Sequence, residues 1–232
     1  MDPLQKKIVI STTTEKPLII TEPTNTDILI NNNVEATIIT QGKIAITINL
    51  QKEAILNYYH INNQEGTNIN SNQYIILLGT HAQANITNLS YGKNDEQSTI
   101  TTTIEHEAAH TKSKFQARGI MRNKATNKSL GLIKINKQAH NAAGNQDIKT
   151  LIFEEAQAYN LPKLVIDNND VQCSHASSVG QPEQEQLFYL QSRGLTEEEA
   201  INTLIKGFYE PVLTTLPINI QSQLRTLIEE RL

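Results

Sequence analysis

Short runs of β-branched residues fill the first 180 positions of this 232-residue chain and constrain its fold more than any other feature. Ile and Thr dominate these runs, which include residues 27–30, 36–40, 44–48 and 100–104. β-Branched side chains favour extended backbone, because two heavy atoms on Cβ fit a pleated sheet better than a helix. Clusters of Asn, Gly and Asp, which favour turns, separate the runs at residues 31–33, 62–63 and 92–95. The pattern predicts many short strands and no long helix before about residue 180.

A weak repeat runs through the same region, in which an alanine follows Glu or Gln and opens a strand-like run. The pairs are Glu35-Ala36, Glu53-Ala54, Gln83-Ala84 and Gln157-Ala158. Units of roughly 20 to 30 residues are typical of stacked repeat architectures. Small residues recurring at one corner would let successive coils stack at the strand spacing of about 4.8 Å. The pattern favours a β-solenoid, and an ordinary β-sandwich remains the alternative.

The composition changes near Gly180, where Ile, Thr and Asn give way to Glu, Gln, Leu and Arg. We therefore expect a β-rich body over residues 1–180 and a helical region over residues 181–232. Pro182 suits the first turn of a helix, and the apolar stripe that follows it ends near Gly194, a residue typical of helix C-termini.

A second helix is predicted to begin at a capping box, with Thr196 as N-cap and Glu199 at the third helical position. Its apolar face is formed by Ile201, Leu204, Ile205 and Phe208. Pro211 is expected to end or kink this helix, because proline lacks a backbone N–H and clashes with the preceding turn. The apolar positions of residues 218–232 predict a third, short helix.

The charge balance and the single cysteine limit the classes of function. A formal net charge of −4 gives no basic patch for nucleic-acid phosphates, so no nucleic-acid partner is expected. No apolar run approaches the roughly 20 residues that span a bilayer, and the N-terminus has no signal-peptide pattern, so we expect no membrane partner. Cys173 is the only cysteine, which excludes an internal disulfide and suits a reducing compartment. We expect a cytoplasmic protein.

The motif His106-Glu107-Ala108-Ala109-His110 matches the His-Glu-x-x-His zinc site of metalloproteases. That chemistry requires a helix, since only there do residues i and i+4 reach one ion from the same face. The run at 100–104 instead predicts a strand, on which the two histidines would stand about 13 Å apart. Lys112 and Ser113 also stand where a metzincin needs Gly and His. A zinc-dependent hydrolase using this motif is therefore an alternative that its flanking residues disfavour.

Cys173 and His175 are the other candidates for chemistry, because the chain has neither a phosphate-binding loop nor a serine-nucleophile elbow. On a strand, residues two apart point to the same face, about 6 to 7 Å apart at the backbone. Thiolate and imidazole are both soft or borderline metal donors, so the two could face one metal cluster. A buried Cys173 and a hydrogen-bonded His175 without a metal role are the alternative that spacing alone leaves open.

A longer pattern surrounds these two residues. It consists of Asp170-Val171-Gln172-Cys173-Ser174-His175-Ala176, then Val179-Gly180, then residues 185–195. Upstream, further residues follow in matching order: His110-Thr111-Lys112-Ser113, Arg118-Gly119, Gly131, Gln138-Ala139, Gln146 and Pro162. Together they resemble the SufB/SufD family of iron–sulfur cluster assembly proteins, in its SufD form, over roughly residues 99–208.

The resemblance implies a right-handed parallel β-helix followed by a small helical region. It also implies a complex in which SufC is the ATPase and SufB with SufD provides the surface where a nascent cluster forms. The chain would then be a non-catalytic scaffold with a SufB-like subunit and a SufC-like ATPase as partners, and with self-association into a homodimer in isolation. The apolar positions Leu204, Ile205 and Phe208 are candidates for docking the ATPase, or simply for covering the β body. A metal-free β-solenoid interaction protein is the remaining alternative.

In SufD-type relatives the histidine of the Cys-Ser-His segment is implicated in the cluster site. His175 is therefore the metal ligand by motif match, with Cys173 as its neighbour. Iron–sulfur clusters usually take about four protein donors, mostly thiolates, so the cluster would be transient and shared with a partner subunit. SufB-like chains carry a cysteine in the stretch matching residues 155–162, and its absence here favours the SufD form. The family's glycine after the histidine is Ala176 here, which we expect to alter the backbone approach near His175.

Overall fold

The computed structural model describes residues 6–21, 25–62, 68–216 and 218–231, and this part of the chain contains fourteen strands and three helices. The odd-numbered strands are β1 (Lys6–Ile10), β3 (Asn25–Ile30), β5 (Ala45–Leu50), β7 (Ile69–Leu77), β9 (Gln97–His106), β11 (Thr126–Ile135) and β13 (Gln157–Ile166). The even-numbered strands are β2 (Leu18–Ile20), β4 (Glu35–Gln41), β6 (Ile55–Asn62), β8 (Gln83–Gly92), β10 (Lys112–Met121), β12 (Ala142–Ile152) and β14 (Val171–Gly180). The helices are α1 (Gln184–Ser192), α2 (Glu197–Leu213) and α3 (Ile218–Arg231).

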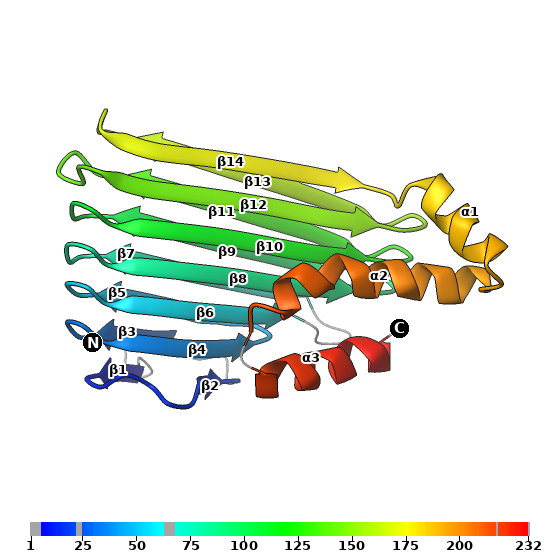
Figure 1. Cartoon of the computed structure of the whole chain (residues 1–232), viewed down its shortest axis with the longest axis horizontal. Helices are drawn as coiled ribbons and strands as arrows, with labels where there is room; N and C mark the ends of the chain where they lie inside the picture. The colour runs from blue at the N-terminus through cyan, green and yellow to red at the C-terminus, as the bar shows by residue number, and fades with distance from the viewer. Residues whose placement is uncertain (1–5, 22–24, 63–67, 217, 232) are drawn as a thin grey trace.

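The strands form two seven-stranded parallel sheets, here called the odd sheet and the even sheet after their strand numbers. Successive strands alternate between the sheets, so each coil of the chain adds one strand to each. Figure 1 shows the even strands running left to right in front and the odd strands returning behind as the chain climbs, which makes the coil right-handed. The predicted right-handed parallel β-helix is therefore confirmed, and the β-sandwich alternative is wrong.

The coils lengthen along the chain. Glu35 pairs with Ile55, an offset of 20 residues, whereas Lys112 pairs with Ala143, an offset of 31 residues. The strands account for much of the difference, because β4 has 7 residues and β12 has 11. The later strands reach further toward the helices (Figure 1). The weak sequence repeat thus reflects real coils, and its irregular spacing reflects their changing length.

Three of the four alanines of the sequence repeat lie at one corner, where the even strands begin. Ala36, Ala54 and Ala84 are at most 1% exposed there, whereas Ala158 begins an odd strand and so lies at the opposite corner. At this corner the chain is tied to the next coil by backbone hydrogen bonds, such as the 2.8 Å bond from Gln83 N to the carbonyl oxygen of Ala54. The corner is not uniformly small, because the buried Leu56 pairs with both Ala36 and Ala84.

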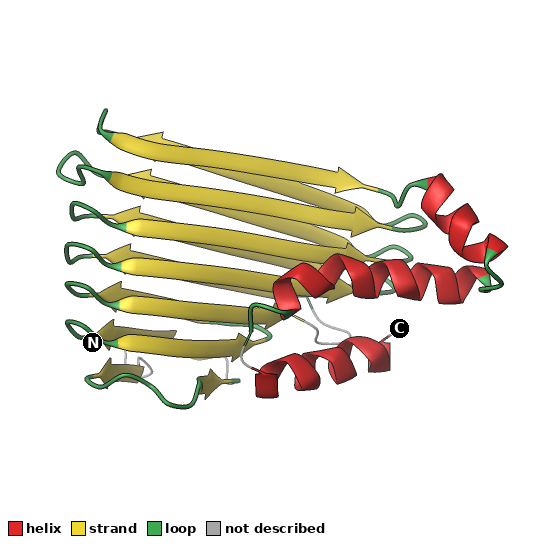
Figure 2. Ribbon diagram, viewed as in Figure 1, coloured by secondary structure: helices red, strands yellow, loops and turns green. Residues whose placement is uncertain are grey.

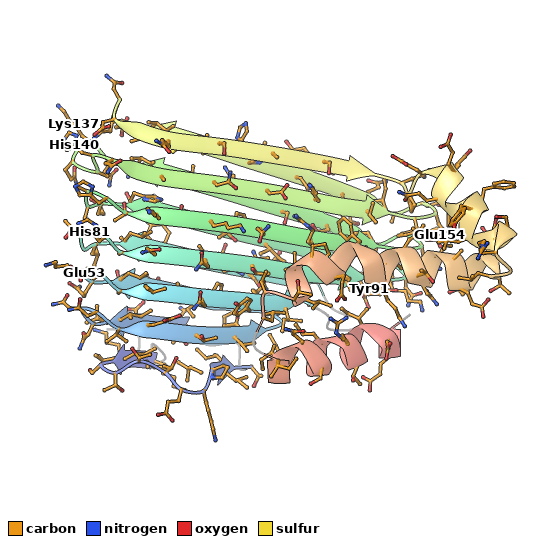
Figure 3. The ribbon with its side chains drawn as sticks, in the orientation of Figure 1. Glu53, His81, Tyr91, Lys137, His140 and Glu154 are labelled. Atoms are coloured by element: carbon orange, nitrogen blue, oxygen red, sulfur yellow. The ribbon has the colours of Figure 1, made fainter. Side chains whose placement is uncertain are left out.

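The same corner contains a row of five residues in the left-handed backbone conformation, which we call the corner row. It comprises Asn33, Glu53, His81, His110 and Asn141, with φ between 52° and 63°. Each is one coil from the next and precedes an even strand, and Figure 3 marks Glu53 and His81 on this edge. Asn tolerates this conformation well, whereas Glu and His adopt it at a cost that the stacked coils must offset.

The helices α2 and α3 cover the outer face of the even sheet near the ends of its strands, and α1 lies beyond the end of β14 (Figures 1 and 2). Ile205, Tyr209 and Val212 of α2 are at most 1% exposed and pack in one cluster with Ile39 and Leu89 of the sheet. The phenol of Tyr209 donates a 2.7 Å hydrogen bond to the carbonyl oxygen of Ser90. The apolar face predicted for the second helix therefore belongs to the protein's own core.

The start of α2 is fixed to the coil by charge. Arg122, 6% exposed, forms ion pairs with Glu154 at 3.2 Å and with Glu198 at 3.1 Å. The predicted capping box is confirmed, because the side chain of Thr196 accepts from the backbone N–H of Glu199 and the reciprocal bond is present.

Two helix ends test the sequence expectations. The first helix ends at Ser192, and Gly194 follows with φ of 98°, so its role at the helix end is confirmed. Pro211 lies inside α2, which continues to Leu213, so the proline does not end that helix. None of the helices described is both long and apolar enough to span a lipid bilayer.

Candidate functional site

The last coil leaves one end of the solenoid uncovered. β13 and β14 are the terminal strands of the two sheets, and among the described strands none pairs with their outer edges. On β14 the inward-facing side chains are Val171, Cys173, His175, Ser177 and Val179, because they alternate with the outward ones and follow the inward columns of earlier coils. These side chains face the interior, yet no further coil lies above them. We call this surface the open end.

His175 occupies the open end of one such column. It pairs with Gln146 on β12, which pairs with Phe115 on β10. Gln146 and Phe115 are 0% and 1% exposed, whereas the side chain of His175 is exposed. The imidazole therefore lies where a core residue lies in the earlier coils. It is accessible because no further described coil covers it.

Gln146 places a polar atom directly beneath His175. Its Nε2 donates a 2.9 Å hydrogen bond to the carbonyl oxygen of Lys163, while its buried Oε1 has no hydrogen-bond partner among the described residues. Gly131 makes room for this oxygen, since a Cβ at that position would stand 2.4 Å from Oε1. Any larger residue at this position would displace the amide under the site.

Cys173 lies two residues before His175 on the same face, as predicted from the strand alternation. It is partly buried and packs against the interior cluster together with Val171. Burial raises the pKa of the Cys173 thiol, opposed in part by a backbone hydrogen bond from Gly144. The thiol is therefore protonated at neutral pH in the isolated chain, and it needs a metal or a positive charge to act as a thiolate ligand.

The donors at the open end fit half of a cluster site. Iron–sulfur clusters take about four ligands, and the described residues contain no group of three or more His, Cys, Asp or Glu placed for one metal ion. His175 and Cys173 supply one imidazole and one thiol. A cluster handled at this end as cargo would need its remaining ligands from another chain.

Ala176, which replaces the family's glycine, does not face the site. It pairs with Asp147 within the regular strand β14 and points to the outer surface. Asp147 forms a 2.6 Å ion pair with Arg118 beside it. The added methyl group therefore lies on the opposite side of the strand from His175.

The His-Glu-x-x-His motif does not form a zinc site. His106 is the last residue of β9, is 0% exposed, and hydrogen-bonds through Nδ1 to Thr111 and through Nε2 to Ser113, each at 2.8 Å. Burial lowers its pKa to about 4, which keeps it neutral. His110 is exposed in the following turn, where its ring stacks on that of His81. The two histidines have separate partners, and the metalloprotease interpretation is wrong.

Exposed apolar side chains of the described helices include two adjacent aromatic residues on α1, which sequence reasoning missed, and Ile218 at the start of α3, which is 80% exposed. Ile205 is fully buried and Leu204 and Phe208 are partly buried, so they are poor docking residues. Phe188 and Tyr189 of α1 are 73% and 62% exposed. The signal was present in the sequence, because successive helical residues are about 100° apart and two adjacent aromatic residues are both buried only under a wide apolar face.

Comparisons with known proteins agree on one family. The family model described as SUF system FeS cluster assembly, SufBD core domain, matches residues 44–208. The iron–sulfur cluster assembly protein SufD of Bacillus subtilis is 33% identical over 157 residues, which is 67% of this chain and 36% of the relative. A SufBD family protein of Mycobacterium tuberculosis is 29% identical over 154 residues, 66% of this chain and 18% of the relative. The matched segment thus spans about a third or less of these relatives.

Proposed function

Because the chain belongs to the SufBD family of the SUF iron–sulfur cluster assembly system, we propose that it is a non-catalytic scaffold subunit that presents half of a cluster site at its open end. A SufB-like subunit supplies the other half, and a SufC-like ATPase drives the complex. The observation that carries the proposal is the position of His175, an exposed imidazole in a column that is otherwise buried.

The chemistry of the donors supports a shared site. A neutral imidazole can bind iron without losing a proton first, whereas the Cys173 thiol must be deprotonated against the effect of burial on its pKa. His175 is therefore the principal ligand, and Cys173 joins only when a partner or the metal stabilises its thiolate. The cluster is cargo that leaves for another protein, which suits a site with few permanent ligands from one chain.

The uncovered edge of the last coil supports a partner at this end. Unpaired strand edges attract other strands, and soluble proteins usually cover or charge them. Ile166 and Val179, both inward-facing on the last coil, are 41% and 40% exposed. A SufB-like subunit would bury them in the complex, and a second copy of this chain would do so in isolation. We propose that the complex acts in the cytoplasm.

Cluster formation on the reconstituted complex tests the role of His175. With SufB-like and SufC-like partners added, His175→Ala should abolish the cluster absorbance that the parent chain supports. Ser177→Ala is the matched control, because Ser177 is also exposed and lies on the same inward face of β14. Equal cluster yield from the His175→Ala and parent complexes would refute the assignment and favour a metal-free interaction protein.

The ATPase is proposed to dock on α1. Its aromatic residues Phe188 and Tyr189 are exposed, and aromatic side chains dominate binding energy at interfaces. Replacing both by alanine should weaken binding of the SufC-like subunit by roughly tenfold or more, measured by surface plasmon resonance. Tyr159→Ala removes an aromatic that is 56% exposed on β13 and should leave this binding unchanged. Binding that survives the double substitution would place the ATPase elsewhere.

A further inference from the structure

The second histidine of the His-Glu-x-x-His motif, His110, has no part in the proposed function. Its ring stacks on that of His81, with ring centres 4.8 Å apart and planes 4° from parallel. Both side chains are exposed, and the two residues are neighbours in the corner row (Figure 3 marks His81). The ring distance equals the spacing of adjacent coils, about 4.8 Å, so the stack follows directly from the fold.

The backbone holds both rings in place before any ligand arrives. His81 and His110 have φ of 63° and 61°, so their Cβ atoms leave the chain in the same direction. The backbone N–H of His81 donates to the carbonyl oxygen of Ala109 at 3.3 Å, and that of His110 donates to His140 at 2.8 Å. Only side-chain rotation is needed to bring the two rings closer.

Three of the four ring nitrogens make no hydrogen bond within the described residues. Within the described residues His110 makes one side-chain hydrogen bond, between its Nδ1 and Nδ2 of Asn141 at 2.8 Å, and the His81 ring makes none. A flipped Asn141 amide would present its oxygen at the same place and accept from Nδ1–H. Nε2 of His110 would then carry a lone pair, and such outer partners orient metal-binding histidines.

We propose that His81 and His110 together bind one divalent transition-metal ion of borderline softness, such as Ni²⁺, Cu²⁺ or Zn²⁺, through one nitrogen of each ring. Imidazole is a preferred ligand for these ions. Two nitrogens bound to one tetrahedral zinc stand about 3.3 Å apart, so the ring tips must close by about 1.5 Å from the present stack. Water completes the coordination.

The described surroundings add no third side-chain ligand to the two histidines. Glu53, the next residue of the corner row beyond His81, places a carboxylate on the same edge, and Lys52 at 3.4 Å partly offsets its charge. Because no larger group of ligating side chains occurs in the described part of the chain, the site has two protein ligands. It is separate from Cys173 and His175, which lie on the interior face of β14.

Calorimetric titration of the whole untagged chain with NiCl₂ tests the proposal. A Cys173→Ser background removes the one thiol, and we expect one Ni²⁺ bound per chain. His81→Asn and His110→Asn should each weaken binding by about tenfold or more, since each removes one of two ligands. The double variant should bind little worse than either single variant. Asn is chosen because it tolerates the left-handed backbone of this row.

His140→Asn is the matched control. His140 is exposed one residue before the corner row, and its Nδ1 lies 3.2 Å from Nδ2 of Asn168, so Ni²⁺ binding should be unchanged. As a second readout, Ni²⁺ should raise the melting temperature of the background chain and not that of His81→Asn. Absence of binding to the background chain, unchanged binding in both single variants, or equal loss in His140→Asn would overturn the proposal.

Discussion

The middle coils and the last coil place side chains in the same columns, but only the last coil leaves them open. In one column Ile86, Phe115 and Gln146 are at most 1% exposed, and His175 at its end is exposed. In a column of the odd sheet, Ile135 is 0% exposed and its partner Ile166 is 41% exposed. The exposure of a side chain therefore depends on which coil of the solenoid it belongs to, as well as on residue type.

This difference explains how a solenoid can build a site without a cleft. A functional side chain that points inward from a middle coil of the solenoid would be buried by the coils on either side, as His106 is. A side chain that points inward from the last coil is oriented by the sheet and is still accessible. The cost is an uncovered interior surface, which a partner chain can bury.

The largest expected difference between the two regions is in stability. Phe115→Ala would leave a cavity in a sealed part of the interior and should lower the free energy of unfolding by about 3–5 kcal/mol. His175→Ala, two strands away in the same column, should change it by less than about 0.5 kcal/mol, because the exposed imidazole has little packing to lose. Urea denaturation measures both. A similar loss for both variants would mean that the isolated chain already covers its open end.

Acid should destabilise the sealed interior through its buried histidines. Burial lowers the pKa of His106 to about 4 and that of His60 to about 3, whereas an unfolded histidine titrates near 6.5. Below pH 6.5 the unfolded chain therefore binds protons that the folded chain does not. The part of the free energy of unfolding that depends on these histidines being neutral is fully present above pH 6.5. It is lost as the pH falls toward 4 and below.

For His106 alone the loss amounts to about 3 kcal/mol between pH 6.5 and 4. Urea denaturation at a series of pH values measures it. His106→Gln should flatten the pH dependence, since glutamine does not titrate. An unchanged slope in His106→Gln would show that other groups control acid stability.

Much of the fold could be predicted from the residues. The β-branched runs and turn clusters indicate strands before residue 180, and the capping box of Thr196 and Glu199 fixes the start of α2. The choice between solenoid and sandwich could not be made from pattern, because both bury alternate residues. The register decides it, and register depends on contacts between residues 20 to 31 positions apart.

The site was only half predictable. Strand alternation places Cys173 and His175 on one face, but it does not say that this face is inward or that the coil ends there. The helix pattern identifies Ile205 as apolar without showing that the even sheet buries it. In both cases the sequence shows which residues share a face, but it does not show which part of the protein packs against that face.

The helices repeat the contrast between sealed and open surfaces. Tyr209 of α2 is 1% exposed and its phenol donates to the carbonyl oxygen of Ser90, so Tyr209→Phe should cost about 1 kcal/mol by leaving that bond unmade. Tyr189→Phe on α1, where the ring is 62% exposed, should cost nothing measurable. Thermal denaturation of the two variants compares them. Equal effects would show that α1 is buried in solution, contrary to its proposed docking role.

The smallest expected effect on the isolated chain separates an open end from one covered by a partner. Val179 is 40% exposed and continues a column from Thr150. Val179→Thr keeps the shape and adds a hydroxyl, which stays hydrated in the isolated chain and should change its stability by less than about 0.5 kcal/mol. If a partner seals this end, the hydroxyl is buried without an arranged acceptor, which costs about 1–3 kcal/mol and weakens assembly by roughly fivefold or more.

Sedimentation or titration with the SufB-like subunit measures that loss, and Ser178→Thr on the outer face of the same strand is the control. Unchanged assembly by Val179→Thr would mean that the partner does not cover the interior column.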